Sequence, residues 1–179
     1  MDKALSMIGS REMGAKTLIS QQEYLETSYP DRAPEYVEGE VVERSVPNLF
    51  HSKAQKRVLA SFERVEAKLD LFAHPELRIP VTTEKFRIAD VVVYAEQEPT
   101  EAIPTQVPHV IVEIVSPDDR YEEIMTRLEE YRVWGVPHVW LVDPGLRRGY
   151  VYHEAGLKAV EAFQLSDFDV RIPLEEILR

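Results

Sequence analysis

Two short runs of mostly Val and Ile residues, each interrupted by one carboxylic acid, constrain this chain more than any other feature. "IADVVVY" (residues 88–94) contains Asp90, and "HVIVEIVSP" (residues 109–117) contains Glu113. Runs rich in Val and Ile are typical of buried strands. A carboxylate inside such a strand is costly unless another group pairs with it. The two acids therefore predict either buried ion pairs or a site that uses them.

The segment between the two runs decides whether the acids can meet. "QEPTEAIPTQVP" is rich in proline and predicts a loop, because it cannot form the interior of a helix. Side chains alternate along a strand, so each acid projects from one face of its strand. If the loop makes the strands neighbours, Asp90 and Glu113 project to one place and repel each other unless a cation lies between them. Magnesium or manganese is the natural occupant, and the carbonyl oxygen of Ile114 is a third candidate ligand.

A simpler alternative pairs each acid with a nearby base. Arg87, Arg120 and Arg127 are the candidate partners in the sequence. For one buried acid this alternative is preferable. Two acids in consecutive strands favour the metal site.

Other patterns predict the elements around these strands. Ser20 and Glu23 have capping-box spacing and predict a short helix. Residues 51–69 carry apolar residues every three or four positions and predict a long helix. A further helix is expected from Asp119 and Glu122, acting as its cap, to Gly135. Strands are expected within 36–45, 136–145, 149–154 and 157–164, and a short helix over 173–179. The order predicts a mixed α/β fold with helices flanking a central sheet.

Length and composition limit the domain organisation and the partners. The 179 residues correspond to one domain, with 18–179 as its extent and 1–17, which lack a period, as a loosely ordered N-terminal arm. The net charge of −11 disfavours nucleic-acid binding by bulk attraction and makes a local basic strip necessary. Cysteine is absent, which excludes thiolate metal sites. The sequence shows neither a membrane span nor a signal peptide, and a cytoplasmic location is expected.

Five segments, taken in order, resemble the bacterial Uma-two family of the PD-(D/E)xK restriction-endonuclease-like superfamily. They are "GEVVER", "HS", "RIADVVVY", "VIVEIVSP" and "RLEEYRVWGVPHVWLVDP". The resemblance spans roughly residues 18–155. It implies a restriction-endonuclease-like fold, with a central mixed β-sheet flanked by helices, and metal-dependent cleavage of DNA. It also implies a homodimer, because cutting both strands calls for two sites.

The resemblance assigns roles to particular residues. Asp90 matches the strand aspartate of the superfamily and Glu113 the acid of its (D/E)xK element, both as metal ligands. Glu40 matches the glutamate of a Gly-Glu element that holds a second or water-linked ion. The superfamily lysine would fall on Val115, and its replacement on the following helix matches Arg127. An arginine stabilises the charge of a phosphate but, with its pKa above 12, does not act as a base.

The start of the long helix holds the candidate nucleic-acid contacts. His51 matches the His-Ser pair of the family and is a candidate phosphate or metal contact, or else a histidine bonded to backbone. Lys53 and Lys56 belong to the one local basic excess long enough to meet a nucleic-acid backbone, although a solvated helix face is the alternative. No glycine-rich phosphate loop is present, so no nucleotide cofactor is expected.

The sequence therefore predicts a metal-dependent endonuclease that hydrolyses DNA. Its catalytic residues would be Asp90, Glu113, Arg127 and Glu40. The main alternative is a catalytically impaired relative that acts as a binding or dimeric interaction module, favoured by Arg127 in place of lysine and by the net charge. A metal-dependent hydrolase of another phosphoester is a third possibility.

Overall fold

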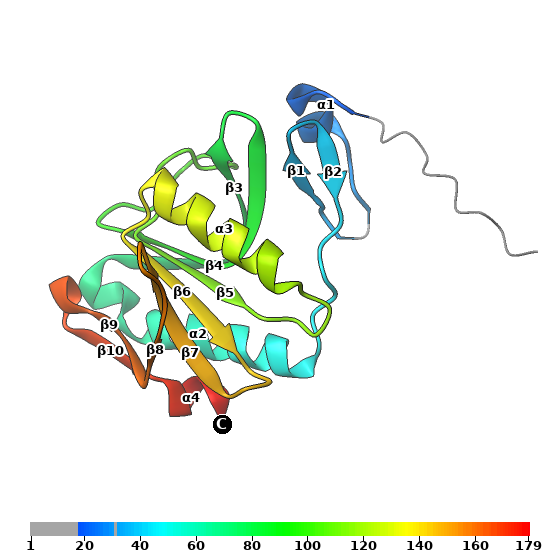
Figure 1. Ribbon diagram of the computed structural model, residues 1–179. Helices are drawn as coiled ribbons and strands as arrows, with labels where there is room; N and C mark the ends of the chain where they lie inside the picture. Colours follow the sequence, from blue (N-terminus) through cyan, green and yellow to red (C-terminus); the bar gives the residue numbers. More distant parts are fainter. Residues whose placement is uncertain (1–17, 31) are drawn as a thin grey trace, which may run out of the picture.

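A computed structural model describes residues 18–30 and 32–179 (Figure 1). The arm expected over residues 1–17 lies outside the described residues. In chain order the elements are α1 (Gln21–Glu26), β1 (Glu35–Val37), β2 (Glu40–Val42), α2 (Leu49–Leu69), β3 (Leu71–Thr82), β4 (Lys85–Ala95), β5 (Val110–Ile114), α3 (Tyr121–Trp134), β6 (His138–Asp143), β7 (Arg148–His153), β8 (Gly156–Val160), β9 (Ala162–Leu165), a 3-10 turn (Ser166–Phe168), β10 (Val170–Pro173) and α4 (Leu174–Leu178).

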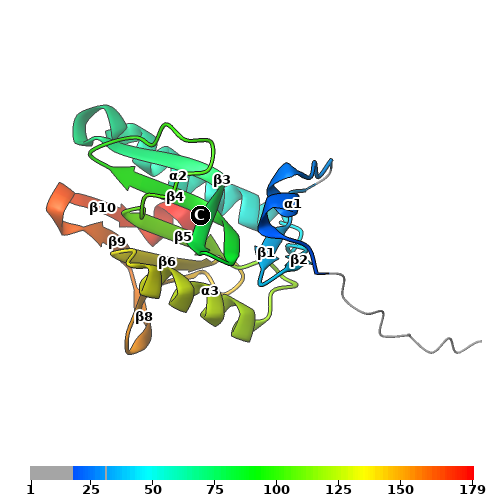
Figure 2. The ribbon, with the colours of Figure 1, turned by 90° about the horizontal axis from the view of Figure 1, so that it is seen from above.

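The central element is an eight-stranded mixed sheet. Its order is β2-β1-β4-β5-β6-β7-β8, with β3 paired along most of β4. β5 and β6 are parallel and the other neighbours are antiparallel. α3 covers one face of the sheet, and α2 with α4 covers the other (Figures 1 and 2). The predicted mixed α/β fold, with helices flanking a central sheet, is confirmed.

Each face of the sheet carries its own apolar core. The core under α2 includes Ala54, Val58 and Phe62, which lie four residues apart and so share one face of the helix. The core under α3 includes Ile124, Leu128 and Tyr131, which form the stripe expected from the sequence. Strand residues alternate between the two cores, so β4 and β5 are buried on both faces.

Helix ends agree with the sequence in two places and differ in one. The Ser20 hydroxyl accepts a hydrogen bond from the backbone N–H of Glu23 and caps α1. Gly135, with φ of 103°, ends α3. The predicted cap of α3 is wrong, because Arg120 occupies that position and makes no side-chain cap bond. The Asp119 carboxylate instead accepts hydrogen bonds from Ser116 N–H and from the Ser45 hydroxyl, both at 2.7 Å.

Two strands were not foreseen. β3 contains Pro75 and Pro80, which argue against a central strand but are tolerated at a sheet edge. The strand expected over 157–164 is divided at Glu161 into β8 and β9. β9 leaves the main sheet and pairs with β10, which is the second unforeseen strand. β10 leads directly into α4 and does not pair with β8.

α1, β1 and β2 form a lobe at one end of the main sheet (Figures 1 and 2). Tyr36 of β1 pairs with Phe86 of β4, and both pack with Tyr24 of α1 in a small aromatic cluster. Because β1 continues the main sheet, we propose that residues 18–179 form one domain. None of the helices within the described residues combines the length and apolar character needed to span a membrane.

Candidate active site

Asp90 and Glu113 come opposite each other where two neighbouring strands stop pairing. Val91 of β4 pairs with Val112 of β5 in antiparallel register, and the two acids are the next residues along each strand. Each is only 4% exposed. Both line a cavity of about 20 Å³, which has room for one water molecule or one ion. The cavity is completed by Arg32, Arg44, Ser45, His51, Ile114, Ser116, Asp119 and Arg127.

The Asp90 carboxylate receives three polar contacts. Ile114 N–H donates to Oδ2 at 2.8 Å, and His51 Nε2 lies 3.1 Å from the same oxygen. A guanidinium nitrogen of Arg44 lies 3.4 Å from Oδ1. Arg44 also pairs with Glu76 at 2.5 Å. Burial acts to lower the pKa of Arg44, but the hydrogen bond to Glu76 and the nearby acids raise it overall, so Arg44 remains charged.

Glu113 has a different environment, although it lies in the same cavity. The Tyr131 hydroxyl donates a hydrogen bond of 2.7 Å to Oε1. Burial raises the pKa of Glu113 to about 7, with a further rise from the charge of Asp90, while Arg127 and the Tyr131 bond act in the opposite direction. A carboxyl group with such a pKa takes up a proton or a neighbouring cation near neutral pH.

Arg127 extends from α3 into the same cavity. One guanidinium nitrogen lies 3.7 Å from Asp119 Oδ1, and the buried Nε has no hydrogen-bond partner within the described chain. Burial acts to lower the pKa of Arg127, but the surrounding acids, Glu113 first, raise it overall. Arg127 is therefore a charged group beside the two acids with donors still available.

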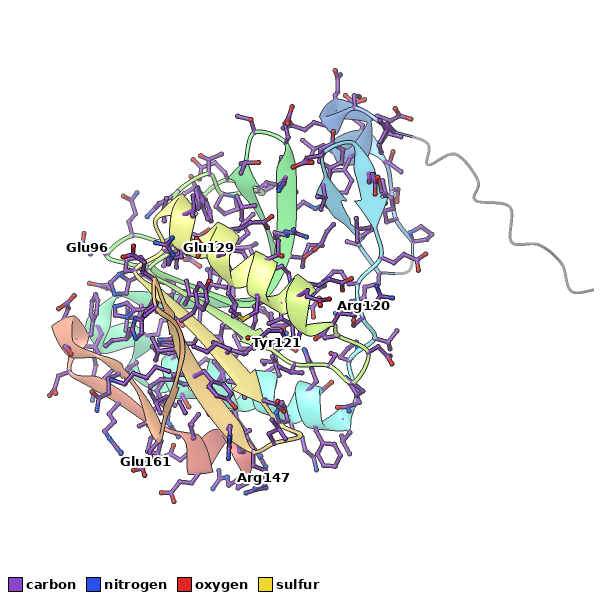
Figure 3. All side chains as sticks on the ribbon, viewed as in Figure 1. Glu96, Arg120, Tyr121, Glu129, Arg147 and Glu161 are labelled. Carbon is purple, nitrogen blue, oxygen red and sulfur yellow. The ribbon has the colours of Figure 1, made fainter. Side chains whose placement is uncertain are left out.

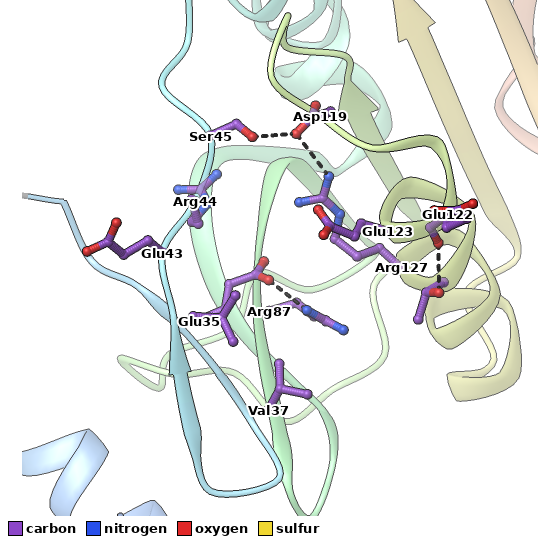
Figure 4. Close-up of a pocket in the computed structure, with 12 residues that line it drawn as sticks. Glu35, Val37, Glu43, Arg44, Ser45, Arg87, Asp119, Glu122, Glu123 and Arg127 are labelled. Atoms are coloured by element: carbon purple, nitrogen blue, oxygen red, sulfur yellow. Dashed lines mark hydrogen bonds and ion pairs between the residues drawn. The ribbon is translucent and has the colours of Figure 1, made fainter. Parts of the chain in front are cut away.

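The segment of residues 43–48, which connects β2 to α2, crosses over the site. It contributes Arg44 and Ser45, and the Ser45 hydroxyl bonds to Asp119 in the loop before α3 (Figure 4). A wider pocket of about 300 Å³ lies beside this segment. Arg44, Ser45, Asp119 and Arg127 line both the small cavity and the wide pocket.

The structure thus brings five of the predicted residues together and separates others. Asp90, Glu113, Ile114 and Arg127 share the cavity. His51 also lies there, but it is only 2% exposed and contacts Asp90 rather than an open surface.

Other predicted residues lie elsewhere. Glu40 pairs with Val37 beside the β1–β2 turn and is not among the residues that line the cavity. Lys53 and Lys56 are exposed on α2.

Sequence reasoning missed Arg44, Ser45 and Asp119 as site residues. Arg44 is the last residue of the "GEVVER" segment, and its place in that segment is the one sequence signal that points to it as a site residue. None of the three bases named as alternative partners pairs with either acid within 4 Å in the described part of the chain. Arg87 pairs instead with Glu35 and Glu130.

The fold implies a divalent metal ion, and the candidate ligands in the cavity fit such an ion. No group of three or more His, Cys, Asp or Glu side chains suited to a metal occurs among residues 18–30 and 32–179. Magnesium, however, is commonly held by one or two carboxylates and retains several waters. The opposed Asp90 and Glu113, the raised pKa of Glu113 and the one-ion volume of the cavity meet that requirement.

The mixed sheet flanked by helices defines a domain of the restriction-endonuclease-like fold class. Residues 21–179 match the model of the Uma2 family (Uma-two), described as "Putative restriction endonuclease", and the chain belongs to this family. Among solved structures it is similar to "a putative nuclease belonging to DUF820" from Anabaena variabilis. The TM-score is 0.78 at 20% identity, over 89% of this chain and 97% of that chain. The search of curated proteins gave no match.

Proposed function

We propose that the protein is a metal-dependent endonuclease that hydrolyses DNA phosphodiester bonds. One observation carries this proposal: Asp90 and Glu113 oppose each other in a cavity of one-ion size that Arg44 and Arg127 also line. The combination of two acids with two fixed cations suits a reaction in which a phosphate gains negative charge in the transition state.

Asp90, Glu113 and the carbonyl oxygen of Ile114 would hold the magnesium or manganese ion. When bound, the ion supplies an activated water and neutralises phosphate charge. Arg127 would bind the phosphate electrostatically, since its pKa prevents it from accepting a proton. His51 and Tyr131 act as positioning residues, because each fixes one of the two carboxylates.

The remaining assignments rest on family membership. DNA is proposed as the substrate because the family is described as putative restriction endonucleases. A homodimer is proposed because cleavage of two strands calls for two sites. The metal-linked role of Glu40 stays a prediction, since Glu40 lies at the β1–β2 turn and not at the cavity. Lys53, Lys56 and His51 are proposed as the nucleic-acid side of the site, with His51 acting through Asp90.

A second function is favoured by a specific contact. Arg44 already pairs with Asp90, and Ile114 N–H and His51 contact the other oxygen. A carboxylate satisfied in this way needs no metal, which suits a catalytically impaired interaction module. Arg127 in place of the family lysine points the same way.

Plasmid cleavage separates the two functions. Supercoiled plasmid and single-stranded DNA would be incubated with the parent chain in magnesium, in manganese and in EDTA. We expect metal-dependent cleavage that is lost in Asp90→Ala and in Glu113→Ala. Arg127→Lys is expected to increase cleavage, because a lysine in this position is able to share a proton with water.

Glu122→Ala is the matched control for these variants. Glu122 is an exposed acid that lines the wide pocket but not the cavity, so its removal should leave cleavage unchanged. Absence of cleavage by the parent chain and by Arg127→Lys, in both metals, would contradict the nuclease and favour the interaction module.

A further inference from the structure

Two larger pockets are present in the described part of the chain besides the cavity, and their charges differ. The wide pocket shown in Figure 4 is lined by three arginines but also by five acids. A second pocket, of about 330 Å³, lies between α2, the β6–β7 turn and α4. Its charged side chains are all basic: Lys53, Arg57, Arg147 and Arg179. We name it the basic pocket. In a chain with a net charge of −11, a polyanion is attracted to the basic pocket rather than to the wide one.

Two of these bases remain available to a ligand. Arg57 donates to the carbonyl oxygen of Ile177 at 3.0 Å and to that of Arg179, so it is already engaged. Lys53 and Arg147 are exposed, and neither has an ion-pair partner within the described residues. Figure 3 shows Arg147 at the lower edge of the molecule, near α4. Free cations at the opening of a pocket are typical contacts for phosphate groups.

The basic pocket adjoins the proposed active site. His51 and Gln55 of α2 face Asp90 with their side chains. Phe50 and Lys53 line the basic pocket from the same helical turn as His51, but from another side of α2. The β6–β7 turn follows β6, which is the parallel neighbour of β5 and of its Glu113. The start of α2 thus takes part in both places, and a strand bound in the basic pocket is expected to lead towards the acids.

An aromatic side chain stands at the edge of the basic pocket. Phe50 is 64% exposed although it is large and apolar. It lies in the first turn of α2, directly before the buried His51. Arg147, in the β6–β7 turn, also lines the basic pocket and has φ of 54°, which is unfavourable for a residue with a Cβ. An exposed aromatic ring interleaved with basic residues is the arrangement by which proteins bind unpaired nucleotides.

We propose that the basic pocket binds single-stranded nucleic acid, with phosphates on Lys53 and Arg147 and one unpaired base stacked on Phe50. The proposal rests on the proposed nuclease function and specifies its substrate as an unpaired strand leading to Asp90 and Glu113. A duplex keeps the faces of its bases stacked on one another and offers none to Phe50. Binding of a duplex through phosphates alone is the competing outcome.

The test measures binding without cleavage. A fluorescent single-stranded oligonucleotide and its duplex would be titrated with the full chain in EDTA, with anisotropy followed at several salt concentrations. We expect the single strand to bind more tightly than the duplex. Phe50→Ala should weaken single-strand binding by roughly 5- to 150-fold, and Phe50→Leu should not restore it, because leucine is apolar but does not stack.

Neutralising the two bases gives a second readout. Lys53→Gln combined with Arg147→Gln should lower the slope of log affinity against log salt by about 1.4, which corresponds to two lost phosphate contacts on a single strand. Lys158→Gln is the matched control, since Lys158 is exposed on β8 and outside the pocket. Thermal melts of each variant check that these exposed positions tolerate the change.

The outcomes separate this proposal from the nuclease. Binding that needs Phe50, Lys53 and Arg147, without plasmid cleavage, would keep the strand-binding site and reject the nuclease. If the Phe50 and Lys53/Arg147 variants bind the single strand as tightly as the parent and still cleave plasmid, the nuclease proposal stands and the proposed binding site is overturned. Equal or tighter binding of the duplex, unaffected by Phe50→Ala, would overturn the single-stranded ligand. No binding by the parent would overturn the site as well.

Discussion

At the scale of single residues, the two site acids differ because their contacts differ. Asp90 receives a backbone N–H, a histidine and an arginine, whereas Glu113 receives one tyrosine hydroxyl in full burial. Burial alone raises the pKa of a carboxyl group, and donors or cations lower it again. Burial raises the pKa of Glu113 to about 7, so this carboxyl group titrates near neutral pH.

This pKa predicts how stability without metal depends on pH. The pKa of Glu113 is about 7 when folded and 4.5 as the reference for the unfolded chain. Between those values the folded protein binds more protons, so the contribution of Glu113 to stability falls as pH rises, by about 3 kcal/mol in total. In EDTA, we expect Glu113→Gln to become more stable relative to the parent between pH 5 and pH 8. Urea unfolding at each pH measures the difference.

Glu122→Gln provides the comparison for that profile. Glu122 is exposed, so the same loss of charge should leave the pH profile parallel to that of the parent. A Glu113→Gln profile that also stays parallel would mean that the buried acid is already ionised at pH 5.

At the scale of elements, the α1–β1–β2 lobe is attached to β4 through a buried arginine. Arg87 donates to Glu35 at 2.7 Å and to Glu130 of α3 at 2.8 Å. Glu35 is only 3% exposed, and Ile88 N–H is its other donor. Arg87 thus connects the lobe, the sheet and α3 in one network.

Removal of Arg87 is expected to loosen the lobe. Arg87→Met leaves Glu35 buried without its cation, and the free energy of unfolding should fall by about 3–5 kcal/mol. Limited proteolysis should then cut between residues 27 and 48 before the rest of the chain. Lys85→Met is the control, because Lys85 pairs with the same Glu130 from a more exposed position and should cost less than about 1 kcal/mol. Equal losses in the two variants would contradict the role of the buried network.

Elements with a strong local pattern were predictable from the sequence, and those defined by distant partners were not. α2, β4, β5 and α3 follow from the periods of their own residues. β3 was missed because its two prolines are acceptable only at a sheet edge, which a single sequence does not reveal.

The same distinction applies to the site. Asp90 and Glu113 stood out as acids within apolar strands, whereas the contact between Ser45 and Asp119 joins residues 74 positions apart. No local pattern indicates such a contact.

At the scale of the whole molecule, the net charge of −11 and the local basic pocket act in opposite directions on a nucleic acid. The overall charge repels it, while a cation held by the opposed acids, as proposed, would neutralise part of the charge near the site. β4 and β5 carry the two acids at the centre of the sheet. For this reason metal binding is expected to stabilise the entire fold.

Manganese should raise the melting temperature of the parent chain. A ligand at one hundred times its dissociation constant stabilises a fold by about 2.7 kcal/mol, which corresponds to a rise of about 5–10 °C for a chain of this length. The rise should disappear in Asp90→Ala and be reversed by EDTA, as followed by thermal unfolding. A parent chain that melts at the same temperature with and without manganese would argue against a metal site.

The small size of the cavity has a consequence for the speed of catalysis. A space of about 20 Å³ holds an ion but not a phosphodiester. The hydrogen bond between Ser45 and Asp119 joins the segment of residues 43–48 to the loop before α3, on the side that faces the wide pocket. If the protein cleaves DNA as proposed, a phosphodiester led from the basic pocket reaches the acids only when these two segments separate. The frequency of that opening would then set an upper limit on the turnover rate, however well the acids and arginines are arranged.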